Sequence, residues 1–336
     1  MLWPLLGGAR FLMALIVANG HLPLFLPTSE LSRLFDNISG LAAVIGFLVI
    51  SGFSIAASYA KKPQGYYRRR AIRIVPLYVL AIVFSAVCTR PFGGVVHAMN
   101  GNFFRTPPWF VVVQNLFFAQ GFTVRSIATD TVVWSLSIEV FFYLFTPLFS
   151  RLSQLALLLI AGASLGLFLI SPSFDALYYA YMRTGAAAAL LGWAWLAGFI
   201  AFRHRDHLVA ALIVLGVSIA ALALNPNFDG THWVAIMGLV AIAFGFGNRI
   251  YGPRWLASVL SLLGDVSYPL YLFHMPIYIV LCGFHVPMMA GGYLFTAIGA
   301  SLVLDRLYDQ PVKRLFKGPG KLRAQPIKDS VMPVAP

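Results

Sequence analysis

Long apolar runs recur from one end of this chain to the other, and most of them are long enough to cross the hydrocarbon core of a membrane as a helix. Only 10% of the 336 residues are charged, whereas charged residues make up about 25% of a typical soluble domain. Because hydrocarbon offers no partner to backbone groups, the runs have to form helices. The sequence therefore predicts an all-α, polytopic membrane protein without a separate soluble domain.

The apolar runs predict about ten transmembrane helices. They fall near 9–27, 40–59, 74–89, 132–150, 155–171, 183–202, 208–224, 231–247, 262–284 and 288–307. A further apolar segment, near 109–121, is short for a full crossing, and we interpret it as a possible re-entrant segment.

Basic residues set the orientation. The densest group lies in a predicted loop, 60–73, and a second group follows the last span. By the positive-inside rule both groups face the cytoplasm, which places both termini there. A full crossing at 109–121 would reverse every later loop and export the basic tail. We therefore expect one transmembrane domain over 1–316 and a basic, disordered cytoplasmic tail over 317–336 that is attracted to anionic lipid. The net charge of +13 is dispersed over short loops, which argues against nucleic acid as a partner.

Arg10 and His21 are ionisable residues inside the first apolar run. Their spacing places them on one helix face, about 16 Å apart along the axis. Ionisable groups at such depth are expensive and usually functional. A snorkelling arginine and a hydrogen-bonded core histidine explain this pair equally well.

A second cluster, 134–143, begins a later span with the sequence Trp-Ser-Leu-Ser-Ile-Glu-Val-Phe-Phe-Tyr. Glu139 and Tyr143 share a face, and Ser135 lies one turn earlier. A buried glutamate stays ionised only beside a cationic or imidazole partner, and we expect that partner to be His21. A structural glutamate bonded to a serine or a backbone carbonyl is the alternative.

A third cluster lies on the predicted 262–284 helix, where Ser267, Tyr271 and His274 share one face. Pro269 and Pro276 interrupt the backbone hydrogen bonding, which suits a helix that lines a cavity. Ordinary interhelical hydrogen bonding and a structural histidine account for this cluster as well.

A fourth cluster comprises Arg70 and Arg73, which are three residues apart and can present two planar guanidinium groups to phosphate oxygens. A role limited to topology and lipid headgroups is the simpler interpretation. No spacing typical of a zinc or redox site is present, and Cys88 and Cys282 both fall in apolar spans.

Taken together, these clusters resemble the integral-membrane acyltransferase-3 family, the bacterial O-acyltransferases that modify glycans and some small molecules. The matching segments are Arg10 with His21, Gly46 to Ile55, Arg70 to Arg73, Trp134 to Tyr143, Ser267 to Tyr271 with His274, and Tyr308 to Arg314. Gln310 departs from the family pattern, in which an acidic residue is common. The resemblance covers about 1–316 and leaves no room for the esterase-like domain of some members.

This resemblance implies that the chain transfers an acyl group, commonly acetyl, from cytoplasmic acyl-CoA to an acceptor hydroxyl at a bacterial inner membrane, without a metal. Arg10, Arg70 and Arg73 would then hold the CoA phosphates. His21 would be the general base, with Glu139 fixing its tautomer. The further candidates for substrate contacts or for stabilising an oxyanion are Ser267, Tyr271, His274, Trp134, Ser135 and Tyr143.

Two alternatives to this hypothesis are open. A covalent acyl-histidine intermediate would replace direct transfer. A transporter or flippase without chemistry would also need ionisable groups at depth, but such proteins commonly carry an internal repeat that we do not find here. Acceptor identity, acyl-chain length and oligomeric state are not encoded in any readable pattern.

Overall fold

The computed structural model describes residues 1–27, 40–171, 176–205, 208–225, 240, 243–245, 247, 250–286 and 289–317. The longer helices are α1 (Leu2–Gly20), α3 (Gly40–Lys61), α4 (Tyr66–Val87), α6 (Trp134–Arg151), α7 (Gln154–Ile170), α9 (Ala186–Arg203), α10 (Leu208–Leu224), α12 (Arg254–Gly283) and α13 (Ala290–Leu304). Shorter helices are α5 (Trp109–Leu116), α8 (Ala176–Tyr181) and α14 (Gln310–Lys317), with 3₁₀ turns η1 (Leu22–Leu24), η2 (Arg90–Phe92) and η3 (Thr131–Val133) and a π-helical turn η4 (Asp305–Asp309). The described residues also form two strands, β1 (Val95–His97) and β2 (Phe103–Arg105).

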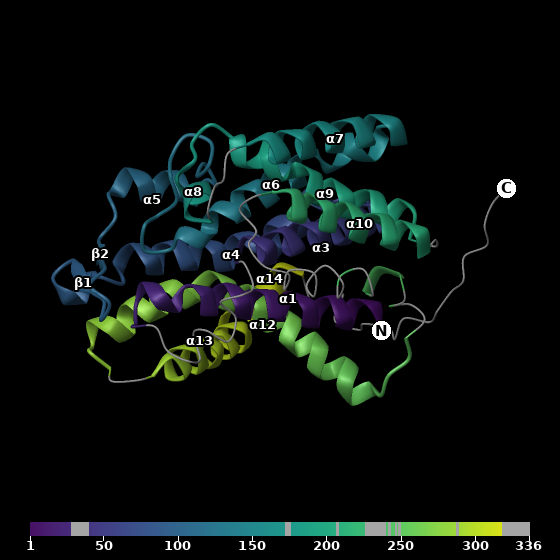
Figure 1. Cartoon of the computed structure of the whole chain (residues 1–336). Helices are drawn as coiled ribbons and strands as arrows, with labels where there is room; N and C mark the ends of the chain where they lie inside the picture. The colour runs from purple at the N-terminus through teal and green to yellow at the C-terminus, as the bar shows by residue number, and fades with distance from the viewer. Residues whose placement is uncertain are drawn as a thin grey trace.

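The helices form an elongated bundle, with β1, β2 and α5 at one end and the N-terminus at the other (Figure 1). Among the residues that the structure describes, six helical segments are long and apolar enough to span a membrane: Leu2–Leu24, Gly40–Lys61, Tyr66–Phe92, Thr131–Arg151, Ala186–Arg203 and Arg254–Gly283. The predicted all-α, multi-pass membrane protein is thus confirmed. The predicted spans at 155–171, 208–224 and 288–307 are helices of 17, 17 and 15 residues, and the span at 231–247 lies almost entirely outside the described residues. The count of ten and the cytoplasmic termini stay predictions, as does the tail, which is described only to 317.

The predicted loop over 60–73 was wrong, because α4 begins at Tyr66 rather than at 74. Gly65 adopts a left-handed conformation, with φ of 67°, and turns the chain directly from α3 into α4. Arginine is a good helix former, and its long apolar stem packs well beside a membrane surface. The arginines of the basic cluster therefore occupy the first turns of a rigid helix.

A small hairpin stands in the connection that follows α4, and sequence patterning did not reveal it. Strands β1 and β2 pair antiparallel, with Val96 opposite Phe104, and three-residue strands are too short to show a periodicity. The segment near 109–121 contains only the eight-residue helix α5. Such a helix rises about 12 Å and cannot cross a hydrocarbon core of about 30 Å.

Close contacts between glycines and backbone hold the bundle together. A Cβ atom added at Gly52 of α3 would lie 1.9 Å from the carbonyl oxygen of Trp195 in α9, and one added at Gly198 would lie 1.9 Å from that of Val49. Gly7 and Gly264 make a similar contact between α1 and α12. Small residues at crossings are the usual way in which membrane helices pack closely.

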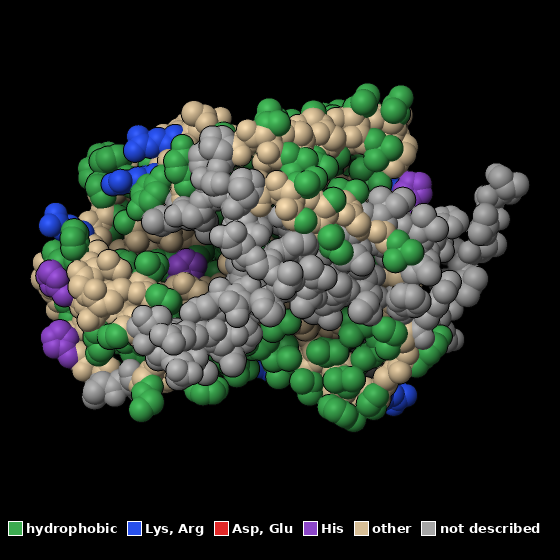
Figure 2. Space-filling model, in the orientation of Figure 1, with side chains coloured by type: hydrophobic (Ala, Val, Ile, Leu, Met, Phe, Trp, Pro, Cys, Tyr) green, Lys and Arg blue, Asp and Glu red, His purple; other side chains and the backbone are tan. Residues whose placement is uncertain are grey.

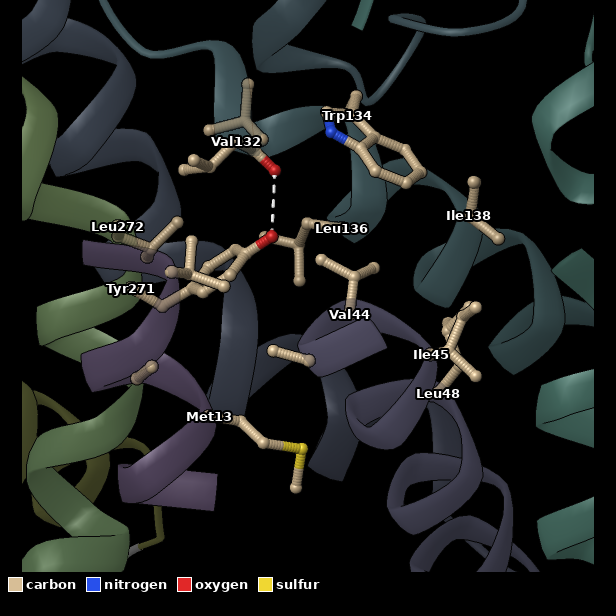
Figure 3. Packing of buried hydrophobic residues seen from close by; sticks show 14 of the residues in the cluster. Met13, Val44, Ile45, Leu48, Val132, Trp134, Leu136, Ile138, Tyr271 and Leu272 are labelled. Atoms are coloured by element: carbon tan, nitrogen blue, oxygen red, sulfur yellow. Dashed lines mark hydrogen bonds between the residues drawn. The ribbon is translucent and has the colours of Figure 1, made fainter. Parts of the chain in front are cut away.

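Around these crossings, side chains from α1, α3, α6 and α12 fill the core (Figure 3). The residues labelled there are Met13, Val44, Ile45, Leu48, Val132, Trp134, Leu136, Ile138, Tyr271 and Leu272. The tyrosine hydroxyl at position 271 donates to the Val132 carbonyl over 3.2 Å, which ties α12 to the turn that begins α6.

The crossing of α3 and α9 gives a stability prediction. Gly198→Ala forces the two helices apart, so we expect it to destabilise the protein by about 1–3 kcal/mol. Gly162→Ala in α7 is the matched control, because an added Cβ there meets nothing within 4 Å. Thermal unfolding in detergent measures the difference, and equal midpoints for the two variants would show that the crossing tolerates the extra methyl group.

Candidate active site

A cavity inside the bundle gathers most of the polar side chains that the sequence singled out. Its walls come from α1, α3, α4, α6 and α12. The polar side chains that line it are Arg10, Ser51, Ser54, Arg70, Arg73, Ser135, Glu139, Tyr143, Ser267, Tyr268 and Tyr271. Three motifs that are far apart in the sequence, in the middle of α1 and in the first turns of α4 and α6, therefore meet in one place.

Three serines of α3 hold the charged groups in this region. Ser51 donates to Glu139 Oε1 over 2.6 Å. Arg10 Nη2 donates to Ser54 Oγ over 2.7 Å, and Arg70 Nη2 donates to Ser58 Oγ over 2.8 Å. The spacing of positions 51, 54 and 58 places these hydroxyls on one face of the helix. Sequence reasoning noted the segment from Gly46 to Ile55 but missed this row of serines, whose signal is serine at helical spacing in an otherwise apolar run.

The cavity carries more positive than negative charge. Arg10, Arg70 and Arg73 face a single carboxylate, Glu139, so the formal sum of three positive charges and one negative charge is +2. The ion pair found within the described ranges joins Lys313 to Asp309, outside the cavity. Arg70 Nε is buried and has no hydrogen-bond partner there. Since buried cations without counter-ions are costly, the arrangement is suited to binding an anion.

Glu139 does not meet His21, contrary to the pairing expected from the sequence. Its Oε1 accepts hydrogen bonds from the hydroxyls of Ser51 and Tyr143. The reason is depth: Glu139 lines the same cavity as Arg10, and Arg10 lies about 16 Å from His21 along α1. Glu139 is thus placed to balance the arginines and not to orient the imidazole.

His21 instead contacts a second histidine, His274 of α12. His21 caps the C-terminal end of α1, and its Nδ1 lies 2.7 Å from the Val17 carbonyl oxygen and 3.3 Å from His274 Nε2. His274 is fully buried, and its Nδ1 lies 3.0 Å from the Leu270 carbonyl oxygen. The two rings are tilted at 47°, with centroids 5.2 Å apart.

The two carbonyls determine both tautomers, because a carbonyl oxygen only accepts hydrogen bonds. His274 Nδ1 therefore carries the proton, which leaves its Nε2 as an acceptor. His21 Nδ1 carries the proton that Val17 and His274 share, which leaves His21 Nε2 unprotonated. This assignment from hydrogen-bond partners identifies Nε2 of His21 as the free base of the pair.

Tyr271 connects the cavity with the histidine pair. Its hydroxyl lies 2.7 Å from Ser135 Oγ, and its ring is 6.4 Å from that of His274 between centroids. The hydroxyl proton is donated to Val132, and that of Ser267 is donated to the Gly264 carbonyl over 2.7 Å. The hydroxyl protons of Tyr271 and Ser267, which the sequence suggested as donors to an oxyanion, are thus donated to backbone carbonyls in this structure.

Trp134 is a buried packing residue rather than part of the cavity. Its ring stacks on Tyr179, with centroids 5.1 Å apart and an interplanar angle of 21°, and it does not line the cavity. In the described part of the chain no group of three or more His, Cys, Asp or Glu side chains could hold a metal ion, and Cys88 and Cys282 are separate, buried free thiols.

The described part of the chain thus forms a multi-pass membrane bundle that holds a cationic cavity and, further along α1 and α12, a pair of histidines. The family model described as an acyltransferase domain, that of the acyltransferase-3 family, matches residues 5–304. The chain therefore belongs to the acyltransferase-3 family and is a multi-pass membrane acyltransferase.

Curated relatives are similar at low identity. Nodulation protein 10 of Rhizobium leguminosarum bv. viciae is 24% identical over 278 residues, which is 72% of this chain and 72% of that protein. A putative acetyltransferase, ORF330, of Acidianus two-tailed virus is 23% identical over 246 residues, 68% of each chain. The O-acetyltransferase OatA of Staphylococcus aureus strain NCTC 8325 is 22% identical over 324 residues, 82% of this chain and 53% of OatA. No solved structure matches the chain.

Proposed function

We propose that this protein transfers an acetyl group from cytoplasmic acetyl-CoA to a hydroxyl group of a glycan or glycan-like acceptor at a bacterial inner membrane. The family and the O-acetyltransferase among the relatives support acyl transfer to oxygen. The observation that carries the proposal is the convergence of three arginines in one cavity, which is also lined by Tyr271, one helical turn before His274 of the histidine pair.

The cationic cavity is the part of the site that suits the donor. Arg70 and Arg73 lie on the first turns of α4, and Arg10 faces them from α1. Guanidinium groups bind phosphate oxygens through paired hydrogen bonds, and Arg70 Nε is a buried donor that lacks a partner within the described residues. These three side chains would hold the phosphates of CoA. The carboxylate of Glu139 would reduce the electrostatic repulsion among the three arginines.

His21 would act as the general base. As the acceptor oxygen forms a bond to the thioester carbon, His21 Nε2 takes the hydroxyl proton, the carbon–sulfur bond breaks and CoA leaves as the thiolate. The imidazolium then returns its proton to the leaving sulfur or to water. An acyl-histidine intermediate would use the same nitrogen.

His274 would be the positioning residue for this base. Its Nε2 accepts from His21 Nδ1, which fixes the tautomer of His21 and stabilises the imidazolium formed in the reaction. This is the role that the sequence suggested for Glu139, taken over by a neutral imidazole on a neighbouring helix.

Removal of the base is the first test. We expect His21→Ala to abolish transfer of acetyl from labelled acetyl-CoA into base-labile ester in membranes that contain the protein and candidate glycans, because the variant lacks the Nε2 nitrogen that would take the hydroxyl proton. General-base removal typically lowers rates about 10²–10⁴-fold. Equal labelling by the native protein and the variant would reject His21 as the base, and absence of label with every acceptor would count against the enzyme hypothesis.

Donor binding tests the arginines separately from chemistry. The double change Arg70→Ala with Arg73→Ala should weaken CoA binding to purified protein by at least about tenfold, since charge-assisted hydrogen bonds are lost. Arg68→Ala is the matched control, because Arg68 is exposed and donates to the Phe316 carbonyl instead of lining the cavity. If the double variant and the control bind CoA alike, the two arginines serve topology only.

The histidine pair predicts a split between turnover and donor affinity. His274→Phe removes the acceptor for His21 Nδ1, so kcat should fall while KM for acetyl-CoA stays unchanged. His274→Gln keeps an acceptor oxygen in reach and should restore part of kcat. Steady-state kinetics of the three proteins decide the point: parallel losses in both variants, or a rise in KM, would indicate a structural role alone.

A further inference from the structure

A second depression lies at the hairpin end of the molecule, away from the arginine cavity. Its volume is about 580 Å³, within the range of about 300–1,000 Å³ that is usual for small-molecule sites. Residues 101–108, which include β2, form one wall, and Thr131 and Met275 lie at its base. We call this depression the hairpin groove.

The hairpin groove borders the histidine pair on two chain segments. Leu24, which lines it, lies three residues after His21, and Met275 directly follows His274. Met275 is 1% exposed, and its sulfur accepts a hydrogen bond from Thr131 Oγ1 over 3.3 Å. A ligand in the groove would therefore sit over the segments that carry both imidazoles, on the side away from the arginine cavity.

The charge of the hairpin groove has one sign. Arg105 and Arg125 are the ionisable cations among its lining residues, and no carboxylate lines it. Both are exposed, and the Arg105 guanidinium lies over the Phe103 ring, 4.9 Å from its centroid. Basic side chains colour this end of the molecule blue in Figure 2. Two cations without an acid beside them favour an anionic group, such as a phosphate or a carboxylate.

The same groove offers flat apolar surfaces. The Phe103 side chain is 55% exposed and that of Tyr181 is 45% exposed, and both line the groove. Exposed aromatic rings bury large apolar areas when they meet a partner, and the carbon–hydrogen faces of sugar rings are suitable partners. Cations beside such rings match a sugar that bears a negative charge.

The hairpin groove is held in shape by the segment that follows His21. Met99 N–H donates to the Phe25 carbonyl over 2.9 Å, and Asn102 Nδ2 donates to the Leu24 carbonyl over 3.1 Å. The rings of Phe25 and Phe104 stack with centroids 4.7 Å apart. A wall that is ordered before the ligand arrives loses less entropy on binding.

We propose that the hairpin groove binds the acceptor and selects a glycan with a phosphate or carboxylate group near the hydroxyl that receives the acyl group. This inference rests on the proposed acyl transfer, because it assigns the groove to the acceptor of that reaction. Arg105 and Arg125 bind the anionic group, and Phe103 and Tyr181 pack against the sugar ring.

Binding in the absence of donor tests the proposal without depending on catalysis. The full chain in phosphatidylcholine nanodiscs is titrated with trigalacturonate and glucose 1-phosphate, and with maltotriose and glucose as neutral counterparts. We expect at least one anionic probe to bind about tenfold tighter than its neutral counterpart. The double change Arg105→Gln with Arg125→Gln should remove that preference, while acetyl-CoA binds as it does to the native protein.

Arg90→Gln is the matched control, because Arg90 is exposed at the same end in η2 and lines neither the groove nor the arginine cavity. An unchanged preference in this variant, with loss in the double variant, supports the groove. The proposal would be overturned if charged and neutral saccharides bound equally or if none of them bound. It would also be overturned if the protein bound only phosphatidylglycerol vesicles, which would indicate a lipid headgroup site instead. Loss of acetyl transfer with intact saccharide binding would count against the proposed function and not against the groove.

Discussion

The gathering of three guanidinium groups at one cavity of a membrane bundle is the constraint on which the rest of the structure depends. Arg10, Arg70 and Arg73 bring a net positive charge into a place where charge is expensive. The bundle meets this cost with one carboxylate and with hydroxyl groups from a single helix, α3. These partners lower the free-energy cost of placing the arginines there, but they leave a net positive charge. A donor that carries phosphate groups would bind to that remaining charge.

Helix α3 can present its serines to the charged groups because the opposite face of the helix is packed tightly against α9. The contacts of Gly52 and Gly198 bring the backbones of α3 and α9 close together, so the row of serines cannot rotate away from the arginines. Packing on one side of a helix thereby sets the electrostatics on the other side. A larger residue at the crossing would displace the hydroxyls as well as separate the helices.

The sequence predicted the composition of the site better than its internal pairing. Ionisable residues in apolar runs are so costly that Arg10, Glu139 and Arg70 could be singled out by position alone. The partner of His21 depends on how α1 packs against α12. The spacing of residues within a single helix does not reveal such a long-range arrangement. The start of α4 was misplaced because arginines in a helix look, in a hydropathy profile, like a loop.

Helices α1 and α12 each carry one group at the arginine cavity and one histidine further along. Arg10 and His21 belong to the first, and Ser267 and His274 to the second. The contact of Gly7 with Gly264 joins these two rods near the cavity end. Because this contact leaves no room between the two backbones, it helps to fix the position of one helix along the other, and with it the 3.3 Å distance between the imidazole nitrogens. The geometry of the histidine pair thus depends on a glycine contact at the opposite end of the same two helices.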